Sequence, residues 1–264
     1  MATSTNIPAV VPPLPQERTW KRPVTPADAF TWLAEGWRDT MVQPATSLAY
    51  GLIVFLAWTG ILGALFALGW DYVMFPALAG LMVIGPILAV GLYEKSRRIG
   101  AREPIRLGAM ILVRPKSGGQ ILFTGVLLCL LMLLWMRAAV IIYALFFGMR
   151  PFPGLEHVAA MLFTTGTGWA MLAVGTAVGG LFAAFSFAIS AVSIPMQLDK
   201  RVDALTAMGS SFALVASNLP AMLTWAAIVL VLFLASAATG FIGLILVFPL
   251  LGHGTWHAYR ATQL

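Results

Sequence analysis

Long apolar stretches dominate this sequence and constrain its fold more than any other feature. They cover residues 47–69, 73–93, 121–148, 169–194 and 220–256. Apolar residues (AVILMFWYC) make up 60% of the 264 residues and charged residues 10%, whereas a soluble domain carries about 25% charged residues. Because so few polar groups cannot cover a soluble globule, the composition excludes an ordinary soluble enzyme and a disordered protein. It predicts an all-α membrane protein with several transmembrane helices.

The number of spans depends on the last stretch. As one straight helix, residues 220–256 would be about 55 Å long, nearly twice the ~30 Å hydrocarbon core of a bilayer. One long bent helix and two short spans both fit the composition, and we predict two spans that divide near 238–240. The polar, proline-rich segment 1–25 is predicted to be a disordered cytoplasmic tail, and 26–264 a six-helix transmembrane domain. The predicted spans are about 47–69, 73–93, 121–148, 169–194, 220–238 and 240–257.

The basic residues support six spans, because Lys and Arg collect in the cytoplasmic segments of membrane proteins. With six spans, 14 of the 16 basic residues fall on one side of the membrane. Half of those 14 lie in the loop between the second and third spans. Both termini are therefore predicted to be cytoplasmic.

Three segments of the chain are similar to one another. Residues 85–97 (GPILAVGLYEKSR) align with 248–260 (FPLLGHGTWHAYR), so that Pro86 matches Pro249, and 187–201 form a weaker third copy. The repeat predicts three helical hairpins that each start and end in the cytoplasm. A short amphipathic helix is expected before each hairpin, and the first begins at Thr25, where Pro26 and Asp28 mark a helix N-terminus. Such helices lie along the lipid headgroups.

Four motifs resemble a known family. GLYEKSRR (91–98), SIPMQLDKRVDA (193–204), SNLPAMLTWA (217–226) and FPLLGHGTWHAYR (248–260) are similar to domain of unknown function 2189, a family of uncharacterised prokaryotic integral membrane proteins. The resemblance runs from about Thr31 to the C-terminus, and Gln197 departs from it where an apolar residue is expected. It implies a multi-pass protein of the bacterial inner (cytoplasmic) membrane. Some relatives are loosely labelled as cytochrome c oxidase subunit I-like, and no catalytic or binding residues are known for the family.

The histidines test the oxidase label. Three histidines are too few for a haem–copper core, which needs several on facing helices. His253 and His257 are four residues apart and share one face of the sixth span, so they could supply two ligands to a metal ion. No Cys or acidic residue close in sequence supplies a third ligand. The sequence therefore predicts no metal site, no cofactor and no catalytic residue. As structural residues rather than metal ligands, His253 would fill a helix interface and His257 would join a polar-aromatic belt at the headgroups.

Arg137 is a candidate functional residue, because a charge inside a membrane span is costly. It lies near the membrane centre if its helix covers 121–148, and at the outer headgroups if the helix covers 118–139. Asp71, Glu156, backbone carbonyls or an anionic ligand such as a lipid phosphate are its possible partners. A functional role and a structural or lipid-anchoring role are both open.

Small residues and prolines complete the candidates. Pro86 and Pro249 lie inside predicted spans, where they free backbone carbonyls that could line a cavity. Gly175, Gly179 and Gly180 make one face of the fourth span narrow, which suits close helix packing or a groove for a partner.

These features predict a non-enzymatic accessory or assembly factor of a membrane complex, with a respiratory oxidase as the candidate complex. The alternative is a transporter or channel for a small or anionic solute, which the repeat, the two prolines and Arg137 favour. A haem or metal enzyme is the least favoured hypothesis. The expected partners are the lipid bilayer and other membrane subunits rather than nucleic acid, because topology accounts for the net charge of +6. The sequence leaves the oligomeric state open.

Overall fold

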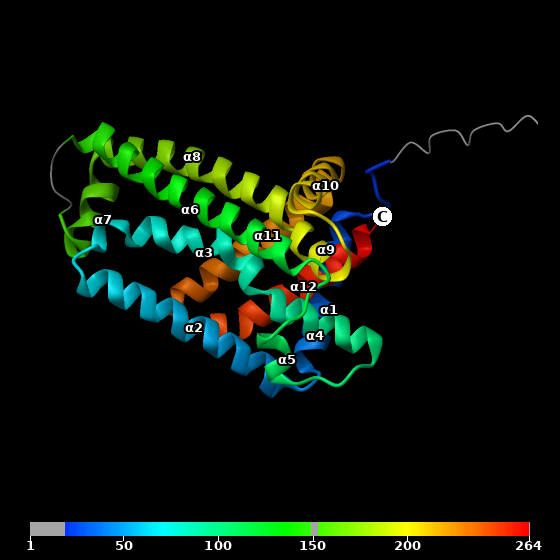
Figure 1. Cartoon of the computed structure of the whole chain (residues 1–264). Helices are drawn as coiled ribbons and strands as arrows, with labels where there is room; N and C mark the ends of the chain where they lie inside the picture. Colours follow the sequence, from blue (N-terminus) through cyan, green and yellow to red (C-terminus); the bar gives the residue numbers. More distant parts are fainter. Residues whose placement is uncertain (1–18, 149–152, 264) are drawn as a thin grey trace, which may run out of the picture.

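The computed structural model describes residues 19–148 and 153–263, and these residues form helices without a strand (Figure 1). This confirms the all-α prediction for the described part of the chain. In chain order the elements are α1 (Pro26–Met41), α2 (Pro44–Ala67), the short 3-10 helix η1 (Asp71–Val73), α3 (Met74–Leu88), α4 (Val90–Ala101), α5 (Leu107–Ile111), α6 (Gly118–Phe147), α7 (Leu155–Thr164), α8 (Gly166–Ser190), α9 (Ser193–Asp199), α10 (Ala204–Ser217), α11 (Leu219–Ala238) and α12 (Leu244–Thr262).

Five helical segments of the described chain are long and apolar enough to cross a membrane. They are Pro44–Ala67, Pro76–Ala101, Gly118–Phe147, Gly166–Asp199 and Leu219–Ala238. Each overlaps one of the first five predicted spans. The segment predicted as the sixth span falls on α12, which is 19 residues long and less apolar because it carries His253, His257 and Arg260.

The last apolar stretch is two helices rather than one. α11 ends at Ala238 and α12 starts at Leu244, and the turn between them contains Gly240 at φ 62° and Phe241 at φ 66°. Backbone in this left-handed region cannot continue a helix. The predicted division near 238–240 therefore agrees with the observed turn.

The two prolines have different effects on their helices. Pro86 lies near the end of α3, which ends at Leu88, and α4 follows after Ala89. Pro249 lies inside α12, which continues without a break. Because proline has no N–H to give, the carbonyl four residues before it, at Ile245, loses its helical donor. A side chain at Gly51 of α2 would collide with that carbonyl, so α2 packs directly against the proline turn.

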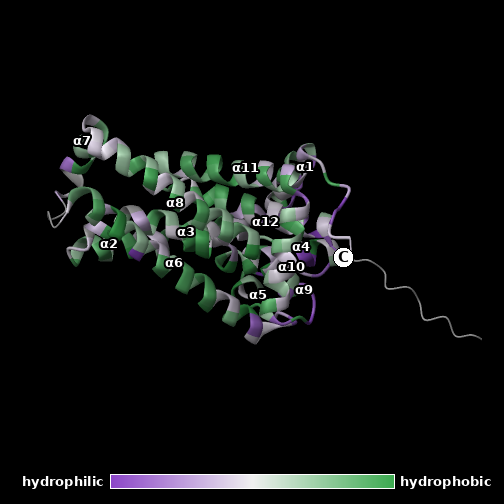
Figure 2. Ribbon diagram, turned by 90° about the horizontal axis from the view of Figure 1, so that it is seen from above, coloured by the Kyte–Doolittle hydropathy of each residue, from purple (hydrophilic) through white to green (hydrophobic). Residues whose placement is uncertain are grey.

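The short helices gather at one end of the molecule. α1, α4, α9 and α10 lie there together, and hydrophilic residues concentrate at the same end (Figures 1 and 2). Their contacts follow a cycle: α4 packs on α5, α9 on α10, and α12 on α1. α4 and α9 thus each touch the helix that follows them in the chain, and the last helix touches the first.

α1 packs through a face that its apolar pattern does not reveal. Its buried residues are Ala29, Trp32, Gly36, Asp39 and Thr40, whereas the large apolar Phe30, Trp37 and Met41 are exposed. The buried face contacts α12 and α11, and Trp32 meets Trp225 of α11 edge to face at 6.1 Å. The exposed face suits a position among lipid headgroups.

The N-terminal tail was predicted to be disordered over 1–25, and residues 1–18 lie outside the described part of the chain. Residues 19–25 are held against the C-terminal half of the chain. The Arg22 amide donates to Asn218 Oδ1 at 2.8 Å, and Asn218 Nδ2 donates to the Trp20 carbonyl at 3.0 Å.

Glycines allow the closest helix contacts in this end of the molecule. A Cβ at Gly36 of α1 would come within 2.7 Å of the backbone of Gly254 and Leu250 in α12. A Cβ at Gly91 of α4 would collide with the Met110 carbonyl of α5 and the Tyr50 ring of α2. Backbone contacts of this kind leave no room for relaxation. α1, α4 and α12 are therefore fixed closely to their neighbours.

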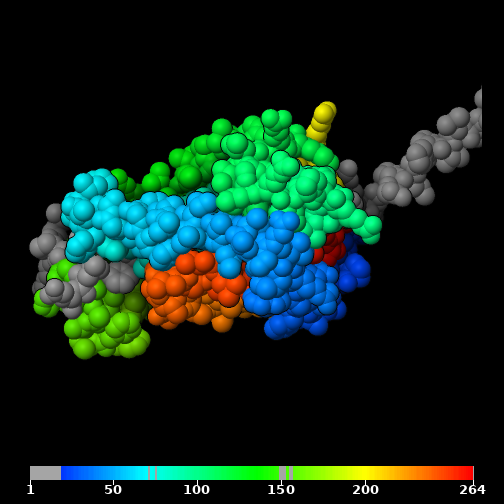
Figure 3. Space-filling model, turned by 90° about the horizontal axis from the view of Figure 1, so that it is seen from below, coloured from blue at the N-terminus to red at the C-terminus, as the bar shows by residue number. Residues whose placement is uncertain are grey.

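Figure 3 shows α2 lying along the orange segment formed by the last two helices.

We predict opposite effects of alanine at two glycines of α4. Gly91→Ala is expected to destabilise the protein by about 1–3 kcal/mol, because the new methyl group meets backbone that cannot move away. Gly100→Ala in the same helix meets nothing within 4 Å and is expected to stabilise it by up to about 1 kcal/mol through helix propensity. Thermal unfolding in detergent or nanodiscs measures both, and equal melting temperatures for the two variants would contradict this packing.

Candidate functional site: a buried polar chain

The end of the molecule that carries the basic residues contains an uninterrupted series of hydrogen-bonded polar side chains, which we call the polar chain. Four helices contribute to it: α1, α2, α4 and α12. In spatial order its members are Lys95, Ser47, His253, Ser96, Asp39, His257 and Glu35.

The inner half of the polar chain starts at a buried amine. Lys95 has no exposed surface, and its Nζ donates to Ser47 Oγ at 2.6 Å and to the Gln43 carbonyl at 3.3 Å. Ser47 Oγ lies 3.1 Å from Nε2 of His253, which is also fully buried. The other ring nitrogen of His253, Nδ1, lies 2.7 Å from Ser96 Oγ. One imidazole thus joins the hydroxyls of α2 and α4.

The outer half leads from a buried carboxylate to the surface. Ser96 Oγ donates to Asp39 Oδ2 at 2.5 Å, and Nε2 of His257 lies 2.9 Å from the same oxygen. Nδ1 of His257 lies 3.1 Å from Glu35 Oε2. The exposed side-chain fraction rises from 10% at Asp39 to 24% at His257 and 39% at Glu35. The polar chain therefore connects a buried amine with the surface.

The chemistry of the two ends fixes the direction of every hydrogen bond between them. A lysine ammonium only donates, so Ser47 accepts from it and gives its one proton to His253 Nε2. The imidazole proton then has to be on Nδ1, which donates to Ser96, and Ser96 donates to Asp39. Starting from the other end gives the same result, because an ionised carboxylate only accepts. The inner hydrogen bonds all run from Lys95 to Asp39.

Asp39 is the negative charge of this series. Burial alone raises the pKa of its carboxyl group, but the hydrogen bonds from His257 and Ser96 and the nearby histidines outweigh burial, and the pKa is lowered from its ordinary value of 3.8. Asp39 is therefore ionised at neutral pH. Together with the ammonium of Lys95 it forms a separated charge pair whose two members are joined through neutral groups.

The α4 motif GLYEKSRR divides between two networks. Lys95 and Ser96 enter the polar chain, whereas Glu94 pairs with the neighbouring arginines. Arg97 Nε lies 2.7 Å from Glu94 Oε2, and Arg98 Nε lies 2.6 Å from Glu94 Oε1. Glu103 completes this group at 3.0 Å from Arg97. The ion pairs cover the surface beside the buried amine.

The comparison with protein families places part of this site. Residues 73–199 match the family described as predicted integral membrane protein, domain of unknown function 2189 (DUF2189). Comparison with curated proteins and with solved structures gives no match.

The match confirms the family resemblance for a narrower segment than the sequence suggested. The DUF2189 segment contains Lys95 and Ser96, whereas Asp39, Ser47 and His253 lie outside it. The motifs at 217–226 and 248–260 also lie outside it. The polar chain is therefore built from both the DUF2189 segment and the parts of the chain that flank it.

The polar chain resembles a hydrolase site in composition but not in access. Ser47 lies beside both a lysine and a histidine, which is the usual way to activate a serine nucleophile. Its side chain is fully buried, however, and it lines neither the hollow beside Ser117 nor the hollow beside Tyr143. Nor do the described residues form a cluster of three or more His, Cys, Asp or Glu side chains that could hold a metal ion. What this arrangement can do is hold charges and pass protons along hydrogen bonds.

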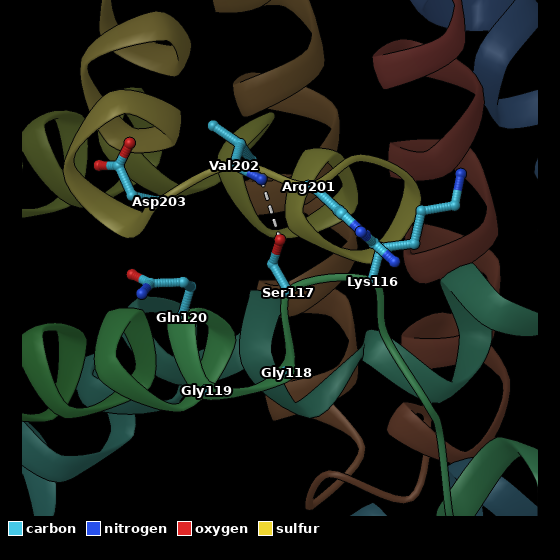
Figure 4. Close-up of a pocket in the computed structure, with 8 residues that line it drawn as sticks. All are labelled: Lys116, Ser117, Gly118, Gly119, Gln120, Arg201, Val202 and Asp203. Atoms are coloured by element: carbon cyan, nitrogen blue, oxygen red, sulfur yellow. Dashed lines mark hydrogen bonds between the residues drawn. The ribbon is translucent and has the colours of Figure 1, made fainter.

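A second polar contact joins the start of α6, inside the DUF2189 segment, to the α9–α10 loop, which follows that segment (Figure 4). Ser117 Oγ donates to the Lys200 carbonyl at 3.0 Å and accepts from the Val202 amide at 2.9 Å. The hollow beside it holds about 490 Å³ and is widely open. Deeper in, Gln197 Nε2 donates to Thr124 Oγ1 at 2.8 Å. Gln197, which departs from the family pattern, thus has a buried polar partner on α6.

Arg137 lies on an exposed face of α6, about 15 Å before the end of a helix about 45 Å long. Its helix extends over both of the ranges weighed from the sequence. No ion pair joins Arg137 to another described side chain, and the side chains of Asp71 and Glu156 lie outside the described ones. An arginine at this position can extend its stem toward the nearer headgroups.

The three glycines of α8 differ in their surroundings. A Cβ at Gly179 would come within 2.8 Å of the Trp135 ring on α6, whereas Gly175 and Gly180 face open space. Gly179 therefore lies in a helix contact of the described chain. Gly175 and Gly180 remain uncovered by it.

Sequence analysis selected His253 and His257 but missed their partners. It did not select Asp39, Glu35 or Lys95. Long-range contacts bring them together, since more than 200 residues separate Asp39 from His257. The signal that could have found them is the motif EKS at the end of an apolar span, where a lysine precedes a serine on the buried face.

We predict that His253 is neutral and carries its proton on Nδ1, the less common tautomer in free histidine. Nitrogen-15 NMR of histidine-labelled protein in nanodiscs distinguishes the two ring nitrogens by their chemical shifts. His253→Gln identifies the resonance. A proton on Nε2 at neutral pH would contradict the hydrogen-bond directions given above.

Proposed function

We propose that this chain is a non-enzymatic protein of the bacterial inner membrane that acts as an accessory or assembly factor of a membrane complex, with a respiratory oxidase as the candidate complex. The proposal starts from an integral membrane protein with the DUF2189 domain and several apolar helices. It adds three elements: the topology, the surface that binds a partner, and the role as an accessory factor rather than a transporter.

In the proposed topology α12 is a sixth crossing, and the six crossings form three hairpins with cytoplasmic termini. The contacts of α12 support this arrangement. Its C-terminal half packs against α1 and α4, at the end where the basic residues lie. α11 begins at the same end of the chain's fold, near Asn218, which binds the backbone of Trp20 and Arg22. α11 and α12 thus leave this end and return to it.

Cysteine labelling tests the topology. In a Cys129→Ser background, we expect Gly69→Cys to react with a membrane-impermeant maleimide added to intact spheroplasts. Gln263→Cys is expected to react only after permeabilisation, because the C-terminus is on the cytoplasmic side. Reaction of both Gly69→Cys and Gln263→Cys in intact spheroplasts would show an odd number of crossings and exclude the three-hairpin arrangement.

The uncovered apolar faces are the observation that carries the accessory role. Within the most apolar windows of α2, α6 and α11, the buried shares are 17%, 17% and 22%. On α8, Leu181 is 71% exposed beside the open Gly180. Lipid or other subunits must cover these faces. Small residues next to long aliphatic ones suit a second membrane helix, because they allow close backbone approach.

Site-specific crosslinking tests the partner surface. A photoreactive amino acid in place of Leu181 is expected to give discrete crosslinked proteins in intact cells, because this side chain points away from the chain's own helices. The same substitution at Leu128, which is fully buried, is the matched control and is expected to give only intramolecular products. If Leu181 yields no protein adduct and the chain purifies alone from mild detergent, the accessory role fails.

Transport of a small or anionic solute is the second hypothesis. Its basis in the sequence is the internal repeat, the prolines Pro86 and Pro249, and Arg137. In the described structure Gly51 covers the carbonyl that Pro249 frees, and Arg137 stands on an exposed helix face. These placements favour transport less than the accessory role. Substrate-dependent uptake into proteoliposomes would favour transport instead.

A further inference from the structure

The amine of Lys95 has one exit for a proton among its partners in the described chain. Its Nζ contacts the Gln43 carbonyl and the Ser47 hydroxyl. A carbonyl oxygen that accepts hydrogen bonds has no proton of its own to pass on, whereas a hydroxyl can accept one proton and release another. Ser47 therefore provides the route, and it leads only to His253.

We propose that Lys95 is a buried proton-exchange site, which takes up and releases protons through the polar chain. This inference goes beyond the proposed accessory role and does not depend on it. The ligand is a proton, and the entrance is at Glu35 and His257, on the partly exposed surface of α1 and α12.

The exchange step balances without any added reactant. The Lys95 ammonium gives a proton to Ser47 Oγ as Ser47 gives its own to His253 Nε2. His253 releases the proton on Nδ1 to Ser96 Oγ, and Ser96 releases its own to Asp39 Oδ2. The charge pair becomes a neutral amine and a neutral carboxylic acid, and every hydrogen bond between them reverses direction.

The outer groups connect this step to solution. His257 donates to Asp39 from Nε2 and faces Glu35 with Nδ1. To carry the proton outward, His257 has to be in its Nδ1–H tautomer: Nε2 accepts the proton of Asp39 as Nδ1 gives its own to Glu35 and so to water. This step leaves the Nε2–H tautomer, which donates again to the ionised Asp39. The charged groups around the site are Asp39 and Glu35 on α1, the two histidines on α12, and Glu94 with its arginines on α4.

The site opens toward one end of the molecule only. On its inner side, α2 and α12 meet at Gly51, Ile245 and Pro249, where backbone and apolar side chains are in direct contact. Protons therefore enter and leave from the end with the basic residues. The arrangement fits storage or sensing of a proton rather than conduction through the membrane.

Hydrogen exchange at the Lys95 amine tests the proposal. In nitrogen-15 lysine-labelled protein in nanodiscs, Lys95 has to be distinguished only from Lys21, Lys116 and Lys200, and Lys95→Arg identifies its signal. We expect Ser96→Ala to slow the exchange of the Lys95 Nζ hydrogens about tenfold or more, because it removes a relay hydroxyl. Ser96→Thr, which keeps a hydroxyl, is expected to restore the rate.

A purely structural role of Ser96 predicts the opposite change in the exchange rate of the Lys95 hydrogens. If Ser96 only holds α4 to α1, its removal loosens the packing, and the exchange becomes faster or stays the same. Ser193→Ala is the matched control, because Ser193 is also fully buried and its hydroxyl donates to the Ile189 carbonyl outside the polar chain. An unchanged or faster rate in Ser96→Ala, with Ser193→Ala at the wild-type rate, overturns the proposal.

A measurement on the wild-type chain covers the case in which Ser96→Ala does not fold. In the wild-type chain, the Lys95 Nζ hydrogens are expected to have a protection factor at least about tenfold smaller than the backbone amides of α4, because the relay exchanges them without opening of the helices. Equal protection factors would show that the amine exchanges only when this end of the molecule opens, and this would overturn the proposal.

Discussion

The charge of Lys95 is the constraint on which the arrangement of this end of the molecule depends. An ammonium without exposed surface is very costly unless polar groups surround it and an opposite charge balances it. Here the opposite charge, Asp39, lies on another helix and is reached through Ser47, His253 and Ser96. A direct ion pair would have needed only two helices. The indirect one requires four, and it thereby fixes α1, α2, α4 and α12 relative to one another.

Close backbone contacts make this geometry possible. Hydrogen bonds of 2.5 to 3.1 Å between four helices need helix axes that lie close and do not shift. Gly36 and Gly254 allow this close approach between α1 and α12, and Gly91 allows it between α4 and its neighbours. Small residues and polar side chains thus act together: the former bring the helices close, and the latter decide their register.

The sequence predicted the spanning helices well, because apolar length and turn residues are local properties. Each of the first five predicted spans overlaps one long apolar helical segment, and 220–256 was divided at the observed turn. The second and fourth segments extend further than predicted, to Ala101 and Asp199. The polar chain could not be predicted in the same way, because its partners are distant in sequence. Asp39 lies on the packed face of α1, and the apolar pattern does not reveal this face because the large apolar residues Phe30 and Trp37 are on the exposed side.

The contact between α12 and α1 has a consequence for biosynthesis. The chain emerges from the ribosome with α1 first and α12 last, so the imidazole of His253 is the final component to arrive. Until then Lys95 and Asp39 are already in place but have no ring to join them. Before α12 packs, no hydrogen-bonded path links these two charges. The polar chain is therefore complete only once α12 has packed against α1, α2 and α4.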